Sequence, residues 1–230
     1  MVKGIITFIS LALLVALMIF NTPVTRVGSG FMIGDGRHVI TYTGLVHEAQ
    51  FITVKFPNED DIKAQSIYAD PANNIALLKL DQPPKVKRTP LVFSNSGPHH
   101  RDNYVFTLGY PWTNTQEDQH RLIEGSLNFS NTSPTNLLHL KMPLEPVHSG
   151  SPLLNTKGEV IGMLLMAQHM EGLNENSGEF NRAVGIKVLK QALEKRSLYE
   201  EALSKPIQGN AQTPAYIESI KNNIVLIEAD

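Results

Sequence analysis

One short segment combines residue types and spacing that suit nucleophilic chemistry. Residues 149–154 read Ser-Gly-Ser-Pro-Leu-Leu, and a turn signal at 155–158 follows them. A serine in a tight turn of small residues can be held so that backbone N–H groups point at its reaction partner, the arrangement that stabilises an oxyanion. The same spacing also fits an ordinary turn, so the pattern by itself leaves both interpretations open.

The other reactive side chains show no spacing typical of a metal or cofactor site. The chain has no cysteine and eight histidines. His99 and His100 lie in a polar loop, and His120, His139 and His169 share no ligand spacing. A formal net charge of −2 gives no electrostatic argument for nucleic acid. We therefore expect no metal, no cofactor and no nucleic-acid partner.

The elements that must position Ser149 are short strands. Runs rich in β-branched residues alternate with turn signals such as Asp35-Gly36 and Asp70-Pro71. The expected strands are 27–33, 38–42, 51–56, 62–68, 74–80, 104–108, 122–129, 137–141, 160–166 and 183–186. A Pro-rich connector near 82–90 divides them into two sets. This pattern predicts an all-β fold of two β units and not a parallel α/β sheet.

One soluble helix is expected late in the chain, at 187–203. Its apolar residues Val188, Leu189, Ala192 and Leu193 fall near one face, as in an amphipathic helix. Residues 205–214 resemble a linker, and the type of the last element, at 215–230, stays open. We therefore divide the chain into an N-terminal segment at 1–24, a β domain at 25–203 and a C-terminal tail at 204–230.

The N-terminal segment has the composition of a transmembrane helix. Residues 4–20 carry no charge, and as a helix they would cover about 25 Å, at the low end of what spans a bilayer. A cleaved secretory signal is the alternative, but residues 18–21 lack the small side chains of a cleavage site. We expect an uncleaved single-pass anchor. Lys3 before it favours an exported domain after it.

Beyond these patterns, the segment around Ser149 resembles the nucleophile signature of HtrA-type serine proteases, Gly-Asn-Ser-Gly-Gly-Pro-Leu-Leu-Asn followed by Gly-Glu-Val-Ile-Gly. The segments 28–33, 74–80, 104–111 and 183–186 agree with the same family in order and spacing. The resemblance covers about residues 27–195. The resemblance implies a chymotrypsin-like double β-barrel with a cleft between the barrels. The expected fold is this double barrel with the C-terminal helix and the N-terminal transmembrane helix described above.

The catalytic positions depart from that family. Its histidine stands in Thr-Asn-Asn-His-Val-Val, but residues 41–46 read Thr-Tyr-Thr-Gly-Leu-Val, so Gly44 occupies the histidine position. Asn74 occupies the aspartate position, and only the nucleophile, Ser149, is retained. At the oxyanion hole, Val147 replaces the family's glycine and His148 replaces its asparagine.

A serine without a base is a weak nucleophile. Loss of the histidine alone costs on the order of 10⁶ in turnover in a comparable enzyme. His47 is a candidate substitute, but one helical turn beyond Gly44 is a shift of about 5 Å, outside the 2.6–3.2 Å reach of a base. We expect His148 to be a loop residue and Lys141 a solvated charge at a strand end.

These observations predict a catalytically inactive HtrA-like serine protease homologue, a pseudoprotease. The resemblance implies an extended or unfolded polypeptide as partner, the inner membrane as location and the periplasmic side for the folded domain. The alternatives are an active trypsin-like serine endopeptidase that uses Ser149 with a relocated base, and a purely structural platform. The family often forms homotrimers, which no residue here tests. The residues after 195 are too few for the PDZ domain that most HtrA-type proteins carry.

Overall fold

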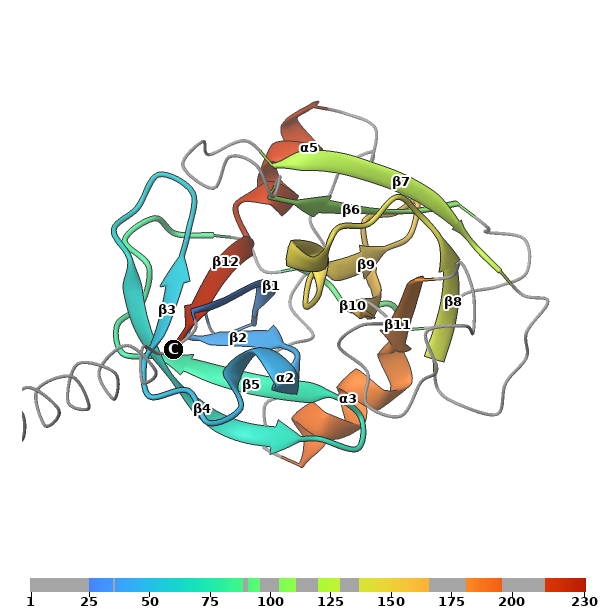
Figure 1. Ribbon diagram of the computed structural model, residues 1–230. Coiled ribbons are helices and arrows are strands. Elements are labelled where there is room, and N and C mark those ends of the chain that lie inside the picture. Colours follow the sequence, from blue (N-terminus) through green and yellow to red (C-terminus); the bar gives the residue numbers. More distant parts are fainter. Residues whose placement is uncertain are drawn as a thin grey trace, which may run out of the picture.

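Two closed antiparallel β-barrels lie side by side in the computed structural model (Figure 1). The structure describes residues 25–34, 36–88, 91–95, 104–110, 120–128, 137–165, 181–195 and 214–230. The all-β double barrel predicted from the strand pattern and the family resemblance is therefore confirmed. The expected transmembrane helix at 4–20 lies outside the described residues. Within them, no helix has the length and apolar character that a membrane crossing requires.

The first barrel holds six strands in the order β1-β12-β3-β4-β5-β2. They are β1 (Arg26–Ile33), β2 (His38–Thr41), β3 (Ile52–Lys55), β4 (Ile62–Asp70), β5 (Ile75–Leu80) and β12 (Ile224–Ala229). The short helix α2 (Thr43–Val46) follows β2 directly and carries Gly44. The sharp turn between β4 and β5 carries Asn74.

The second barrel also holds six strands, in the order β10-β11-β8-β7-β6-β9. They are β6 (Tyr104–Gly109), β7 (Arg121–Leu127), β8 (Leu137–Lys141), β9 (Pro152–Leu154), β10 (Val160–Leu165) and β11 (Asn181–Gly185). The 3₁₀ turn η1 (Pro146–His148) precedes β9, and the helix α3 (Ile186–Glu194) follows β11. Of the helix expected at 187–203, α3 accounts for the first half, and residues 196–203 lie outside the described part.

The C-terminal residues form part of the first barrel, and the expected tail at 204–230 is wrong for its last residues. After the helix α5 (Pro214–Lys221), β12 inserts between β1 and β3 and pairs with both. Its sequence explains this position, because four consecutive apolar residues from Ile224 to Ile227 suit a strand buried on both faces. All four are buried. Without β12, the other strands of this barrel would leave β1 and β3 unpaired on one side.

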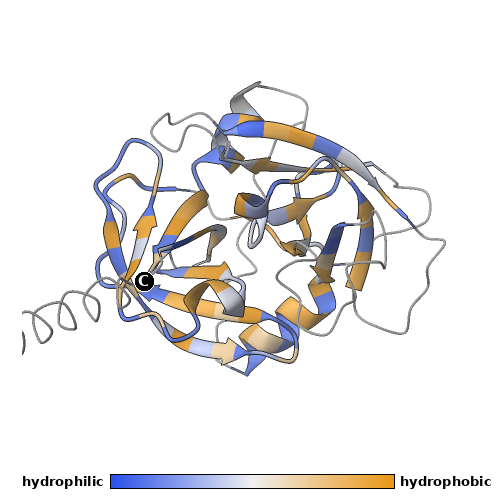
Figure 2. Ribbon diagram, in the orientation of Figure 1, coloured by the Kyte–Doolittle hydropathy of each residue, from blue (hydrophilic) through white to orange (hydrophobic). Residues whose placement is uncertain are grey.

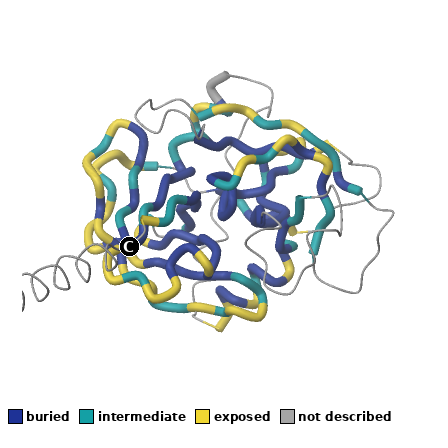
Figure 3. Tube along the Cα trace, in the orientation of Figure 1, coloured by how far each residue is buried: buried dark blue, intermediate teal, exposed yellow. Residues whose placement is uncertain are grey.

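The core fills both barrels and the layer between them. Hydrophobic residues recur along the strands of both barrels in Figure 2, and the inner segments are buried in Figure 3, whereas the outer turns are exposed. A small third cluster at the junction joins Tyr110, Val147 and Leu226, with Val27 packed against them. These residues come from both barrels. The junction therefore includes the oxyanion position, Val147, and the C-terminal strand.

A buried ion pair fixes the connector between the barrels. The side chains of Arg88 and Glu59 form a salt bridge with only 2% and 3% of their surfaces exposed. The Arg88 guanidinium lies 4.6 Å from the ring centroid of Phe56, and its Nε donates to the Asn222 carbonyl at 2.6 Å. Glu59 in turn accepts the Lys85 N–H at 2.7 Å. One charge pair thus ties the connector to the β3–β4 turn and to the residues just before β12.

Candidate active site

Ser149 lies in a sharp turn between η1 and β9 (Figure 1). Pro146 begins the 3₁₀ turn, because its fixed φ suits the first helical position. Gly150 follows Ser149 with a φ of 91°, and a Cβ atom there would lie 2.0 Å from the Ser29 carbonyl oxygen. Only glycine fits this position. The chain thus makes the small-residue turn that the sequence predicts.

The turn is clamped by β1 of the first barrel. The Ser29 N–H donates to the Ser149 carbonyl at 2.9 Å, and Ser29 Oγ donates to the Val147 carbonyl at 2.6 Å. Ser149 is completely buried, with 0% of its surface exposed. A side chain with no exposed surface does not meet a polypeptide substrate in this conformation.

The amide groups of the turn are engaged within the protein. The Ser149 N–H donates to the Pro146 carbonyl at 3.1 Å, and the Gly150 N–H donates to the Leu164 carbonyl at 2.9 Å. An oxyanion hole needs donors that point at the position of the developing charge. The 3₁₀ turn directs the Ser149 amide at its own chain instead.

Gly44, at the histidine position, leaves open space. It is exposed on α2, and a Cβ atom placed there would meet only the Tyr42 ring, at 3.4–3.5 Å, which is ordinary van der Waals contact. The Arg26 guanidinium donates to the Gly44 carbonyl at 3.0 Å and to the His47 carbonyl at 2.5 Å. The backbone at this position could therefore carry a side chain, but the sequence supplies none.

Asn74, at the aspartate position, adopts a left-handed backbone conformation with φ of 57°. Asparagine tolerates this conformation better than most residues. The neighbouring Ile75 carbonyl accepts a 2.9 Å hydrogen bond from Thr43 Oγ1, which brings the aspartate position beside the histidine position. Thr41 Oγ1 donates to the Ser29 carbonyl at 2.7 Å, and Ser29 holds Ser149. Hydrogen bonds thus connect the segments that carry the three triad positions.

The candidate replacement bases are either exposed or hydrogen-bonded to other groups. The His47 side chain is 68% exposed and lies 3.7 Å from a Glu48 carboxylate oxygen. His148 is buried and its ring is occupied by hydrogen bonds: Nδ1 accepts the Glu145 N–H at 2.7 Å, and the Tyr110 carbonyl accepts from the same ring. Lys141 is exposed at the end of β8.

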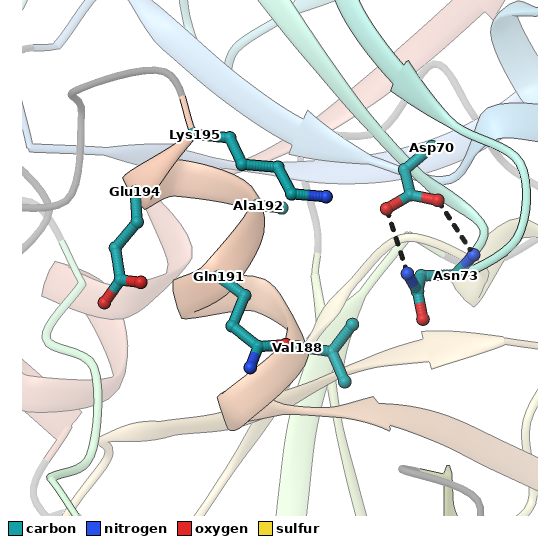
Figure 4. Close-up of a pocket in the computed structure, with 7 residues that line it drawn as sticks. All are labelled: Asp70, Asn73, Val188, Gln191, Ala192, Glu194 and Lys195. Carbon is teal, nitrogen blue, oxygen red and sulfur yellow. Dashed lines mark hydrogen bonds between the residues drawn. The ribbon is translucent and has the colours of Figure 1, made fainter.

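A pocket of about 300 Å³ lies between the β4–β5 turn and α3 (Figure 4). Burial raises the pKa of Asp70, but hydrogen bonds from Asn73 and Tyr68 and the charge of Lys195 together lower it below its usual range. The Asp70 carboxylate accepts the Asn73 side-chain amide at 2.9 Å and its N–H at 3.2 Å. The Asp70 carboxylate therefore stabilises the β4–β5 turn through its hydrogen bonds with Asn73.

Among the described residues, no group of three or more His, Asp or Glu side chains could hold a metal ion.

Sequence patterns missed three contributors to this site. Ser29 clamps the turn, Tyr110 contacts both η1 and β12, and Leu226 packs at the junction against Val147. Ser29 lies inside the Gly-Ser-Gly run of β1, which signals close approach of another backbone. Tyr110 and Leu226 come together only through the closure of the barrels, which no local pattern reports.

Comparisons with known proteins agree with the fold. The sequence model of the family described as "Trypsin-like peptidase domain" matches residues 28–163. A "Probable periplasmic serine endoprotease DegP-like" of Pseudomonas fluorescens is 28% identical over 142 residues, which are 59% of this chain and 28% of that protein. Its counterpart in Ectopseudomonas mendocina is 29% identical over 138 residues, again 59% of this chain and 28% of that protein. The chain thus spans little more than a quarter of these relatives.

Solved structures show the same fold. The serine endoprotease from Yersinia pestis superposes with a TM-score of 0.59 at 22% identity, covering 76% of this chain and 58% of that one. The inactive form of the Rv3671c protease gives a TM-score of 0.55 at 20% identity, covering 74% of this chain and 87% of that one. On its fold and its matched sequence, this chain belongs to the family of trypsin-like peptidase domains.

Proposed function

We propose that this chain is a pseudoprotease: a catalytically inactive trypsin-like domain that binds a polypeptide segment without cutting it. The observation that carries the proposal is the state of Ser149. Its surface is completely buried, and its N–H donates to the Pro146 carbonyl. Gly44 adds a second, independent deficiency, because no base stands at the histidine position.

The expected losses in turnover support inactivity. Loss of the base costs on the order of 10⁶ in turnover, and loss of one oxyanion donor costs about 10²–10³. Asn74 at the aspartate position cannot stabilise an imidazolium, and Gly44 provides no imidazole. The alternative of an active endopeptidase needs a base beside Ser149, and the exposed His47 side chain is held near Glu48.

Polypeptide binding is proposed from the named relatives, which are serine endoproteases. The periplasmic relatives and the apolar segment at 4–20 support a domain that is tethered to the inner membrane and faces the periplasm. We extend to this chain the expectation that its partner segment is extended or unfolded.

A role as a platform for a folded partner is a second candidate, and the sheet topology favours it. Both barrels are closed, so the edges to which an extended peptide could add as a further strand are limited to short stretches, such as the first part of β7, which pairs only with β6 among the described strands. Binding to a folded partner needs no such edge.

The test is to incubate the 230-residue chain with unfolded casein and with a fluorophosphonate probe, beside Ser149→Ala. We expect no hydrolysis and no labelling, and we expect both proteins to bind labelled unfolded casein equally in fluorescence anisotropy. Hydrolysis and labelling that disappear in Ser149→Ala would refute inactivity, and His47→Ala would then test the relocated base. Absence of anisotropy change, with co-purification of a folded membrane complex, would favour the platform.

A further inference from the structure

Tyr110, at the end of β6, lies between two buried imidazoles. Its ring centroid is 4.1 Å from that of His120, which precedes β7. Its backbone carbonyl accepts a hydrogen bond from the ring of His148, which precedes Ser149. The Tyr110 side chain also packs with Val147 and Leu226. One residue thus contacts the turn of the nucleophile position and the C-terminal strand.

The geometry fixes both imidazoles in the neutral form. Nδ1 of His148 accepts the Glu145 N–H at 2.7 Å, so this nitrogen carries no proton. Nε2 of His120 lies 3.1 Å from the Ile224 carbonyl, which only accepts, so Nε2 carries the proton there. Nδ1 of His120 is buried and has no hydrogen-bond partner among the described residues.

A second proton added to either imidazole would have no hydrogen-bond acceptor among the described residues. On His148 Nδ1 it would oppose the Glu145 N–H, and on His120 Nδ1 it would be buried without a partner in the described part of the chain. Burial lowers the pKa of His148, against the opposing effects of the Glu145 charge and the Tyr110 carbonyl. Burial lowers the pKa of His120 to about 4. The hydrogen bond to the Ile224 carbonyl opposes this shift, and the charge of Lys221 adds to it. Glu145 and Lys221 are the charged groups that face the two rings.

We propose that Tyr110, His120 and His148 form an acid-sensitive latch that holds the Ser149 turn and strand β12 together at neutral pH and releases both in acid. In the open state, both histidines take a proton near the ordinary pKa of 6.5, whereas in the closed state they take it at lower pH. Between these values the open state binds more protons, so acidification favours opening. Above about pH 6.5 the closed state keeps its full advantage. The inference goes beyond the proposed function and does not require it.

Protonation of the two histidines would change the hydrogen bonds that hold the Ser149 turn and the first residue of β12. Release of His148 removes the bond to the Glu145 N–H that closes η1, and with it the geometry that engages the Ser149 N–H. Release of His120 removes the hydrogen bond at the first residue of β12. Acid would therefore expose Ser149 and loosen the strand that closes the first barrel at the same time.

Amide hydrogen exchange of the 230-residue chain tests this, with protection factors corrected for the intrinsic rate at each pH. We expect protection at Ser149 and Leu226 to be constant above pH 6.5 and to fall together below it, by about tenfold per pH unit for each imidazole that titrates over that interval. Leu78, in β5, should keep its protection. Equal loss at Leu78 would indicate global unfolding and overturn the latch, as would constant protection at Ser149 and Leu226.

Variants separate titration from packing. His120→Gln keeps a donor for the Ile224 carbonyl, and His148→Asn keeps an acceptor for the Glu145 N–H, but neither side chain titrates in this range. The double variant should lose the pH response, whereas His47→Gln, at an exposed histidine outside the latch, should keep it. A double variant with the unchanged response would overturn the proposal. Should it fail to fold, NMR titration of the wild-type imidazoles decides: ordinary pKa values near 6.5 for both would overturn it too.

Discussion

In the proposed pseudoprotease, Gly44 and Ser149 would fail as a catalytic pair for two separate structural reasons. The backbone at Gly44 has room for a side chain, so the missing base is a matter of residue type. Ser149 is different, because its burial and its amide bond to Pro146 are properties of the turn. Different substitutions would therefore be needed to restore a base at Gly44 and to expose Ser149.

Restoring the base and its partner tests this distinction. We expect the double variant Gly44→His, Asn74→Asp to fold, because Gly44 offers space and aspartate is also found at positive φ. It should still show no hydrolysis of unfolded casein, since the turn keeps Ser149 covered. Turnover that depends on Ser149 in this variant would mean that the turn opens readily in solution.

Gly109 is a residue whose smallness serves the neighbouring His148 ring. A Cβ atom at Gly109 would lie 2.2 Å from the His148 ring, which two hydrogen bonds hold in place. Gly109→Ala should therefore lower the free energy of unfolding by about 1–3 kcal/mol, as in other overpacked cores, in urea denaturation. Gly44→Ala is the matched control, because its Cβ has ordinary contacts and alanine favours a helix. Equal effects of the two variants would contradict this account.

At the scale of elements, the sequence predicted ten of the twelve strands in the described residues, because β-branched runs between turn signals are local features, whereas the two barrels were implied by the family resemblance. The two strands it missed are those that close each barrel. β9 is short and follows the Ser149 turn directly, and β12 lies far along the chain from its partners β1 and β3. Pairing over such a separation leaves no local pattern. The triad positions are predictions from the family signature, whereas the burial of Ser149 depends on contacts with Ser29 that no signature reports.

The connector between the barrels depends on the buried pair of Glu59 and Arg88. Glu59→Gln leaves the Arg88 charge buried without its partner, so we expect a loss of about 3–5 kcal/mol in the free energy of unfolding. The double variant Glu59→Leu, Arg88→Met should lose clearly less, since apolar residues of similar size often replace a buried pair without loss. Urea denaturation of the three proteins measures both effects. If the single variant were as stable as wild type, the pair would not hold the connector.

At the scale of the whole molecule, the first barrel includes both ends of the described chain. β1 pairs with β12 from Arg26↔Ala229 to Phe31↔Ile224, so strands from opposite ends of the sequence share one sheet. The second barrel lies between them in sequence. The first barrel therefore closes only when the last residues of the chain are present, and the stability of the two barrels is coupled through β12 and the junction cluster.

Deleting residues 223–230 should abolish the folded first barrel. The removed segment buries Ile224, Val225, Leu226 and Ile227, each worth about 1.5–3 kcal/mol, a sum comparable to the whole stability of about 5–15 kcal/mol of a typical protein. Ile227→Ala provides a graded version, with an expected loss of about 2–5 kcal/mol in urea denaturation. Glu228→Ala, on the same strand as Ile227, removes only a partly exposed ion pair with Lys55 of β3, so it should cost less than about 1 kcal/mol. A shortened chain with the wild-type urea midpoint would show that β12 is an addition to the barrel and not one of the strands on which its folding depends.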